Sequence, residues 1–360
     1  MMLHLHELNV NARAAKSDRR SASATGQPHH WLVNLLGQRS VQVTLTAWVV
    51  ANILIQVIAQ GSLPFDRPSM ADMSFGQQIL IANAMIVEIV LLMVIAYALT
   101  RRRAVPAMVT RAPAAALARS ETLLLVAYGV LAQLAGLLLG RSLGWDAISF
   151  HLVGTMYGTH KAVAPIEVFV WAGYNFLVYA VLPFLFFRRR YSAEDLNLRS
   201  SDRRNDLRLI VVILLLETLF ELVAGGFAIF ELSPRQVALG APLTFGVYFL
   251  GTVMPTMVFI YCILLPRYLR LTGSAATTVI LGGLTYALLH FFDAWMVFKT
   301  PGDAALSLIF LLMLYVAPGM FKSLLTLRTG NAWVHVWAYH AIVPHTIGNT
   351  GLIVKIFGIR

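Results

Sequence analysis

Residues 331–349 read NAWVHVWAYHAIVPHTIGN, an apolar stretch that is interrupted by three histidines. Residues 284–290, LTYALLH, end a second apolar run with another histidine. Both runs are long enough to cross a bilayer, for which an α-helix needs about 20 residues. An ionisable side chain at that depth is costly and generally has a function. The two stretches therefore predict a membrane fold and place its candidate site in the last third of the chain.

The composition of the 360-residue chain is that of a polytopic membrane protein. Hydrophobic residues make up 58% and charged residues 12%, and the mean hydropathy is +0.71, whereas a soluble domain carries about 25% charged residues. The net charge of +11 reflects basic residues in alternate loops, so we expect membrane lipids and no nucleic acid as their partner. The single cysteine, Cys262, excludes an intrachain disulfide and a cysteine-based metal cluster.

Apolar stretches of about 20 residues recur along the chain and predict an all-α fold, a polytopic membrane helix bundle of about nine transmembrane helices. Their centres lie near Ala51, Val90, Leu131, Leu177, Leu219, Met254, Tyr286, Tyr315 and Ala341. Every second loop is rich in basic residues, and among them we count Lys322 as a loop residue. By the positive-inside rule the N-terminus is cytoplasmic, and we expect an integral protein of the bacterial inner membrane.

The chain divides into three parts. Residues 1–40 are polar and basic and predict a disordered cytoplasmic arm. Residues 41–206 form the N-terminal membrane helices, and residues 207–360 form the core that carries the candidate site. The loop 140–166 is the longest on the outer side, and its aromatic residues are compatible with a short interfacial helix.

Two carboxylates share a helix face in the fifth predicted span. Glu217 and Glu221 are four residues apart, and the pair lies near the bilayer centre, so both must face protein, water or a cation. Either one could act as a base, or both could bond to neighbouring helices. Glu88 is similarly placed but isolated in the sequence, which favours a structural role.

Tyr286, His290 and Asp293 also share a helix face, because they are four and three residues apart. A carboxylate beside a histidine can fix its tautomer, which suits either a metal ligand or a general base. Membrane histidines are more often simple contacts between helices, but other histidines at similar depth favour a functional role for His290.

The last span contains His335, His340 and His345. Residues five apart point about 140° away from each other on an α-helix, so His340 and His345 would not share a face in regular geometry. Pro344 removes a helix hydrogen bond and could kink the helix, which would bring the two together. Asn349 is four residues after His345 and shares its face, whereas the position of His335 near the inner end favours an interfacial role.

At these residues the sequence resembles the CPBP family of intramembrane peptidases, which includes CAAX prenyl endopeptidases and bacteriocin self-immunity proteins. The segment Tyr286-Ala287-Leu288-Leu289-His290 is similar to the family's FxxxH motif, with tyrosine in place of phenylalanine. The segment from Leu327 through Trp333 to His340 is similar to the run into its third motif. The resemblance covers residues 243–350 and implies a peptidase in which glutamate activates water, histidines bind a metal or assist, and asparagine stabilises the oxyanion.

The chain departs from the family's pattern at the first motif, EExxxR. Thr256, Met257 and Tyr261 stand where the two glutamates and the arginine belong. In the third motif, Pro344 occupies the position of the expected asparagine, although His345 and Asn349 keep the spacing. Only the histidines therefore carry over directly, and Glu217 or Glu221 would have to replace the missing carboxylate.

Three functions stay open at this point. The first is an intramembrane peptidase with the catalytic residues Glu217, Glu221, His290 and His340. Its divalent metal, zinc in the simplest case, would be held by His290, His340 and His345. The second is a catalytically inactive relative that binds a membrane protein or a lipidated peptide as an assembly or regulatory subunit. The third is a metal or ion site in an unrelated helical bundle. The sequence does not decide whether the protein is an enzyme.

Overall fold

The structure, a computed structural model, describes residues 33–155, 158–224 and 228–360. The chain separates into two compact units, Met1–Thr46 and Ala47–Arg360, and helix α3 (Arg39–Ala59) crosses the boundary. Most of the predicted disordered arm, residues 1–32, lies outside the described residues. The second unit contains every candidate site residue.

All regular structure in the described residues is helical, with no strand among them. Six of these helices are long and apolar enough to span a membrane, so we treat the chain as an integral membrane protein. They are α3, α4 (Phe75–Thr100), α5 (Ala115–Ser142), the run α6–η3–α7 (Pro165–Asn175, Phe176–Val181 and Leu182–Arg188), the run from α9 to α11, and α13 (Pro301–Thr329).

The run from α9 to α11 covers residues 234–272 without a break. It consists of α9 (Pro234–Tyr248), η5 (Phe249–Val253), α10 (Met254–Thr256), η6 (Met257–Leu264) and α11 (Leu265–Thr272). Ser233 begins it by accepting a hydrogen bond from the backbone N–H of Gln236, and Gly273 ends it with a φ of +64°. Both residue types are favoured at these positions, because serine satisfies a free N–H and glycine tolerates the left-handed conformation.

The other three predicted centres fall in helices that do not meet the same criteria of length, hydropathy and charged-residue content. These are α8 (Arg203–Ala224), the shorter α12 (Ala275–Leu288), and the run α14–η7–α15 (Trp333–His335, Val336–Ile347 and Gly348–Ile356). The helical class of the fold is thus confirmed together with six candidate spans, and the count of nine stays a prediction.

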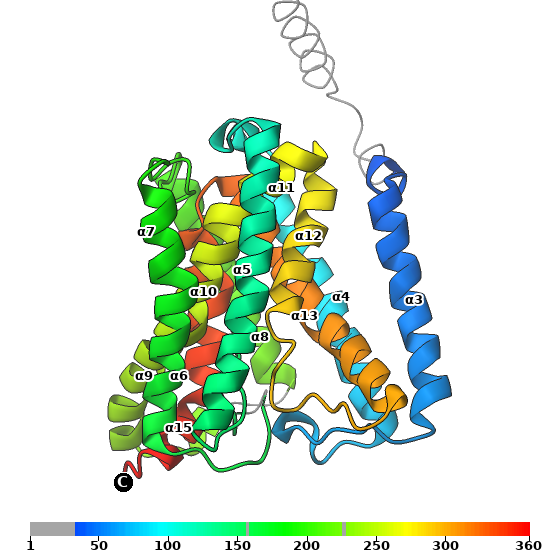
Figure 1. Ribbon diagram of the computed structural model, residues 1–360, viewed down its shortest axis with the longest axis vertical. Helices are drawn as coiled ribbons and strands as arrows, with labels where there is room; N and C mark the ends of the chain where they lie inside the picture. The colour runs from blue at the N-terminus through cyan, green and yellow to red at the C-terminus, as the bar shows by residue number, and fades with distance from the viewer. Residues whose placement is uncertain (1–32, 156–157, 225–227) are drawn as a thin grey trace, which may run out of the picture. The chain divides into compact units, whose positions relative to one another are not determined.

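Small residues let α12 and α13 approach closely (Figure 1). A Cβ atom added to Gly319 would lie 2.6 Å from the Cβ of Tyr286, and one added to Gly283 would lie 2.5 Å from the carbonyl oxygen of Val316. Contacts this short exclude any larger side chain, and glycine is the usual solution where membrane helices pack backbone to backbone. The close packing fixes His290, at the end of α12, against the residues of α13.

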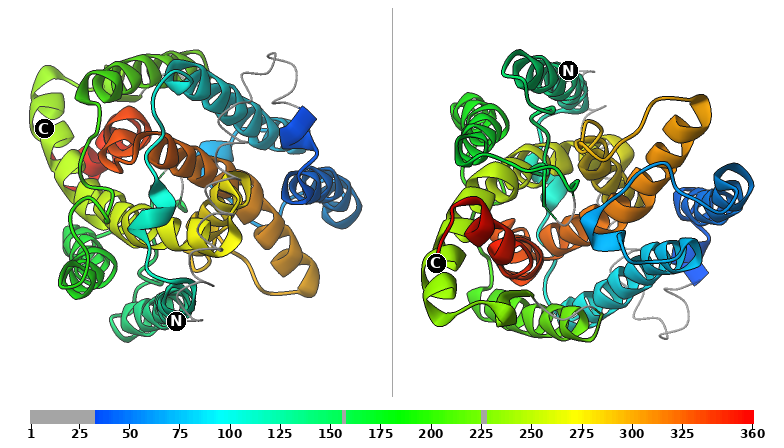
Figure 2. Two further views of the ribbon diagram at one scale, coloured as in Figure 1. Left: turned by 90° about the horizontal axis from the view of Figure 1, so that it is seen from above. Right: turned by 90° about the horizontal axis from the view of Figure 1, so that it is seen from below.

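The helix that bears three of the histidines lies inside the bundle. Its central part, η7, packs against α8 on one side and against α9 and η5 on the other, as both views of Figure 2 show. His335, His340 and His345 are each at most 2% exposed. The interfacial role expected for His335 is therefore wrong, because protein covers this helix on every side of these rings.

Two expectations about loops are also wrong. Between Leu143 and Ala164 the described residues contain no helix. The segment turns inward instead, and His151 within it is 4% exposed. Lys322 is not a loop residue, since it lies within α13 and is 1% exposed, and therefore it cannot serve as a marker of topology.

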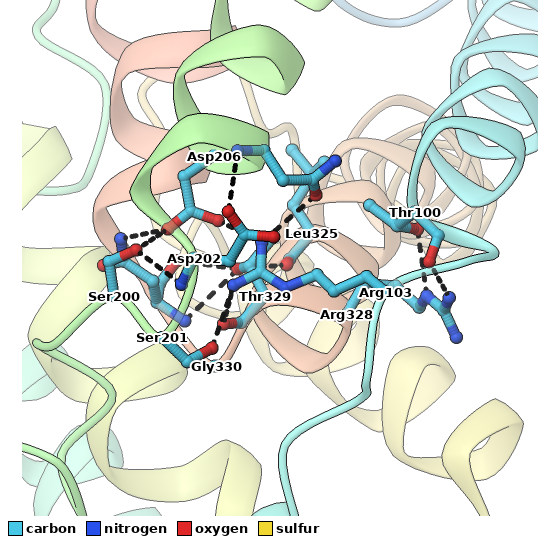
Figure 3. Close-up of polar contacts among 12 residues, drawn as sticks. Thr100, Arg103, Ser200, Ser201, Asp202, Asp206, Leu325, Arg328, Thr329 and Gly330 are labelled. Atoms are coloured by element: carbon cyan, nitrogen blue, oxygen red, sulfur yellow. Dashed lines mark hydrogen bonds and ion pairs between the residues drawn. The ribbon is translucent and has the colours of Figure 1, made fainter.

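Polar contacts join α4, α8 and α13 at one end of the bundle (Figure 3). Arg103 forms an ion pair with Asp206 and donates to the carbonyl of Thr329 at 3.0 Å. Arg328 donates to the hydroxyl and the carbonyl of Thr100 at 3.0 and 2.6 Å. We call this the arginine-rich end.

Candidate functional site

The π-helical geometry of η7 brings His340 and His345 onto one face with His335, the last residue of α14. A π-helix closes hydrogen bonds between residues five apart, so residues at that spacing lie near one another. The ring centroids of His335 and His340 are 6.0 Å apart, and those of His340 and His345 are 4.9 Å apart. In an α-helix the ring of Pro344 would clash with the carbonyl of His340, and the wider turn relieves that clash. His340 and His345 are therefore brought together near Pro344, as expected, but by a change from α-helix to π-helix.

His290 sits at the end of α12 with its tautomer fixed. Its Nδ1 lies 2.7 Å from the carbonyl oxygen of Tyr286, and because a carbonyl only accepts, Nδ1 carries the proton. The lone pair is then on Nε2, which is buried and has no hydrogen-bond partner among the described residues. A histidine held through one nitrogen with the other unprotonated is arranged as a metal ligand or a general base.

Asp293 pairs with a histidine from a distant part of the chain. Its Oδ2 lies 2.8 Å from Nδ1 of His151, and its Oδ1 accepts from the backbone N–H of His151 at 3.3 Å. The hydroxyl of Tyr315 is 3.1 Å from the same Nδ1. Both members of the pair are at most 4% exposed. The carboxylate thus orients His151 with the proton on Nδ1 and the lone pair on Nε2.

Basic side chains surround this pair. Arg67 donates to the hydroxyl of Tyr315 at 3.2 Å, and its guanidinium lies 4.8 Å from the ring centre of Trp295. In the loop between α5 and α6, burial together with Arg67 and Lys322 holds the pKa of His151 well below its usual range. A neutral imidazole is the form that can bind a metal or accept a proton.

Three donor groups converge in the site. One ligand atom from each of His151, His290 and Asp293 can be chosen so that all lie within 4.8 Å of one another, and all three residues are buried. Two imidazole nitrogens and a carboxylate oxygen are a common donor set for zinc at catalytic sites, where a fourth position is left open. The unpartnered Nε2 of His290 fits such an ion.

The histidines predicted as metal ligands lie next to this group. His345 is 6.2 Å from His151, measured between ring centroids, and His151 is 4.6 Å from His290. Five buried imidazoles therefore form a continuous row, which we call the histidine row: His335, His340, His345, His151 and His290. Spacing along one helix could not predict that His151 belongs to this row, because His151 lies in the loop between α5 and α6.

Both carboxylates of α8, Glu217 and Glu221, lie within electrostatic range of the carboxyl group of Glu88. Glu217 is 3% exposed and shares a side-chain hydrogen bond with Glu88 of α4. Such a bond between two carboxyl groups requires a proton on one of them. Glu88 is thus not isolated, contrary to its position in the sequence. Lys322 lies within electrostatic range of Glu217, and its ammonium is 3.7 Å from the ring centre of Tyr286.

The remaining motif residues are occupied within the helices. Thr256 donates to the carbonyl of Thr252, and the ring of Tyr261 lies 4.3 Å from that of His335 between centroids. The amide nitrogen of Asn349 donates to the carbonyls of Pro344 and His345. In this orientation Asn349 has no N–H directed at an oxyanion.

The comparisons with known proteins do not add to this geometry. No family model matches the chain, and no curated protein or solved structure matches it either.

Proposed function

We propose that this protein is an intramembrane hydrolase of peptide bonds in which the Asp293–His151 pair activates water. The proposal is carried by one observation, the contact of 2.8 Å between Asp293 Oδ2 and His151 Nδ1 beside the unpartnered Nε2 of His290. The altered first motif lacks a base that could activate water. The Asp293–His151 pair supplies a candidate base beside His290. The similarity of Tyr286 and His290 to a CPBP motif supports the peptide bond as substrate.

Each residue has a distinct role in this proposal. Asp293 fixes the tautomer of His151, whose Nε2 accepts a proton from water. Tyr315 accepts a hydrogen bond from Arg67 and is itself hydrogen-bonded to Asp293, so it helps to hold the carboxylate in place. A divalent cation held by His151, His290 and Asp293 would be an alternative source of the nucleophile. Nε2 of His151 would then be a ligand rather than the base, and the cation would lower the pKa of a bound water.

We further propose that nine helices of this protein span the bilayer and that residues 243–350 form its CPBP-like part. The arginine-rich end then lies in the cytoplasm of a bacterial cell. The basic residues at the ends of α4 and α8 support this orientation.

The test is cleavage of lipidated and membrane-inserted peptides by the purified protein in lipid nanodiscs. Asp293→Asn keeps the shape of the side chain but cannot orient His151 as a carboxylate does, so we expect the rate to fall about 10²-fold or more. The matched control is Asp303→Asn, since Asp303 only caps α13 and asparagine accepts the same capping bond. Equal rates for both variants would overturn the role of the pair.

A non-catalytic role is the second candidate, and the residues of the first motif favour it. Thr256 and Met257 replace both glutamates and are at most 1% exposed, so apolar packing has taken over that position. An inactive relative would bind a partner protein or a lipidated peptide in the bundle. No cleavage across a library of lipidated peptides, together with a stoichiometric partner after native purification, would favour this role.

A further inference from the structure

The histidine row contains an unusual number of buried polar atoms without partners. Among the described residues, no hydrogen-bond partner exists for Nε2 of His290, for either ring nitrogen of His340, for Nδ1 of His345 or for Oδ1 of Asn349. The ring nitrogens of His335 have none outside that residue. Buried polar groups are nearly always satisfied by protein, water or an ion, so the row requires a further set of partners.

The arrangement of these atoms fits water better than a metal along most of the row. A metal ion needs several donors that converge on one point, and the group that converges is His151, His290 and Asp293. His335, His340 and His345 instead follow one another along a helix, with adjacent centroids 6.0 and 4.9 Å apart. A neutral imidazole offers one donor and one acceptor, which is what a file of bridging waters needs.

The row leads from the polar end of the bundle to the candidate site. At its start, Asn331 is four residues before His335, is 7% exposed, and donates to Oδ2 of Asp206 at 2.9 Å. Asp206 also pairs with Arg103 in the cluster of Figure 3. Arg103 lines a surface cavity of about 520 Å³ together with Arg111, whose guanidinium donates to the carbonyl of Gly330 at 2.7 Å. Further along the row, the ring centroids of His345 and His151 are 6.2 Å apart, and those of His151 and His290, at the other end, are 4.6 Å apart.

We propose that the histidine row is a water path, which carries the co-substrate of hydrolysis from the cavity at the arginine-rich end to the Asp293–His151 pair. The purpose of the path rests on the proposed function, because an active site within a bilayer must be supplied with water. The hydration of the row rests only on its unpartnered atoms. The proposal assigns His335 and His340 as residues that bind water, a role that the family resemblance does not give them.

The first experiment measures access to single cysteines. The one native cysteine, Cys262, is fully buried, and Cys262→Ala provides a thiol-free background. His335→Cys and His340→Cys are then exposed in sealed vesicles to silver ions, a water-sized thiol reagent, and the remaining thiols are counted by maleimide labelling after unfolding. The matched control is Ala338→Cys, at a position on the same helix that is 0% exposed and lies in an apolar cluster.

We expect silver to block both histidine positions at least about 10-fold faster than position 338, with residue 335 blocked first from the arginine-rich side. Equal and slow rates at all three positions would overturn the path. Faster reaction from the opposite side, with residue 340 ahead of 335, would overturn its direction. Neither result depends on cleavage, so a failure of the path is distinguishable from a failure of the proposed hydrolase.

The second experiment uses the unaltered chain, in case a cysteine variant does not fold. Hydroxyl radicals generated inside the protein by X-ray pulses oxidise side chains that adjoin internal water, and mass spectrometry locates the products. We expect oxidation at His335 and His340 and none at Phe310 and Phe321, which are equally buried in apolar surroundings. Protection of the two histidines to the level of the phenylalanines would contradict a hydrated row.

Discussion

Asp293 is the residue on which the proposed chemistry depends most directly, because its partner is an imidazole. The partner of Glu217 is another carboxyl group, that of Glu88.

If a zinc ion binds to His151, His290 and Asp293, one equivalent of zinc should remain after gentle purification. Asp293→Asn and His290→Gln should each reduce the zinc content about 10-fold or more, since each ligand contributes strongly to affinity. Elemental analysis of the purified variants measures this directly.

The control for zinc content is His160→Gln, because the side chain of His160 is 53% exposed and pairs with the exposed Asp66. Loss of zinc in this variant would point to adventitious binding. Full retention in Asp293→Asn would show that the metal, where one binds, has other ligands, for which His340 and His345 are the predicted candidates.

Local spacing predicted some of these residues and could not predict others. Helical spacing predicted that His290 and Asp293 share a helix face. That expectation is wrong, because α12 ends at Leu288 and the two residues are brought together by the turn that follows it. His151 is 142 positions from Asp293, and nothing within its own loop shows that it turns inward. The proximity of Glu88 to Glu217 was missed for the same reason, since it results from the packing of α4 against α8. Contacts of this kind are determined by tertiary packing, which one sequence does not reveal.

At the scale of elements, η7 shows how helix type alters the meaning of a spacing. Three histidines five apart would point in different directions on an α-helix, and the π-helix places them on one face. Pro344→Ala restores an N–H and removes the clash with the carbonyl of His340, so we expect the segment to shift toward α-helix. His345 would then turn away from His151, and peptide cleavage should fall about 10-fold.

The melting temperature in detergent separates this effect from unfolding. Pro344→Ala should not lower it, because alanine is the better helix former by about 3 kcal/mol in a helix interior. Pro242→Ala, in the exposed part of α9, is the matched control and should leave cleavage unchanged. Normal cleavage by Pro344→Ala would show that the alignment of His345 is not required.

The contact between α12 and α13 gives a second prediction about elements. Gly319→Ala would place a Cβ 2.6 Å from that of Tyr286 and 2.9 Å from the Cα of Gly283, where neither backbone can give way without separating the helices. We expect a loss of about 1–3 kcal/mol of stability, as for other overpacked sites. Gly246→Ala meets no atom within 4 Å and should be neutral or stabilising by up to about 1 kcal/mol. Thermal unfolding of both variants in the same detergent measures the difference.

At the scale of the whole molecule, the number of spans determines on which side each part of the chain lies. Six spans alone, the helices that meet the criteria of length and hydropathy, would leave residues 38 and 360 on the same side of the membrane. Nine spans would place them on opposite sides. Of the three further helices, α12 is short, and α8 and α14–η7–α15 carry the carboxylates and three of the histidines. A membrane helix tolerates such polar residues where protein rather than lipid surrounds it.

We therefore expect nine crossings, and reporter fusions in bacteria test them. Alkaline phosphatase, which is active only outside the cytoplasm, should be active when fused after residue 360 and inactive when fused after residue 200, which follows Arg188, Arg189 and Arg190. Fusion after residue 144, beyond α5, is the positive control. Inactive phosphatase after residue 360, with a fluorescent cytoplasmic reporter at the same place, would mean an even number of crossings. The histidine-bearing helix would then enter and leave the membrane on one side, and the water path would have to open there.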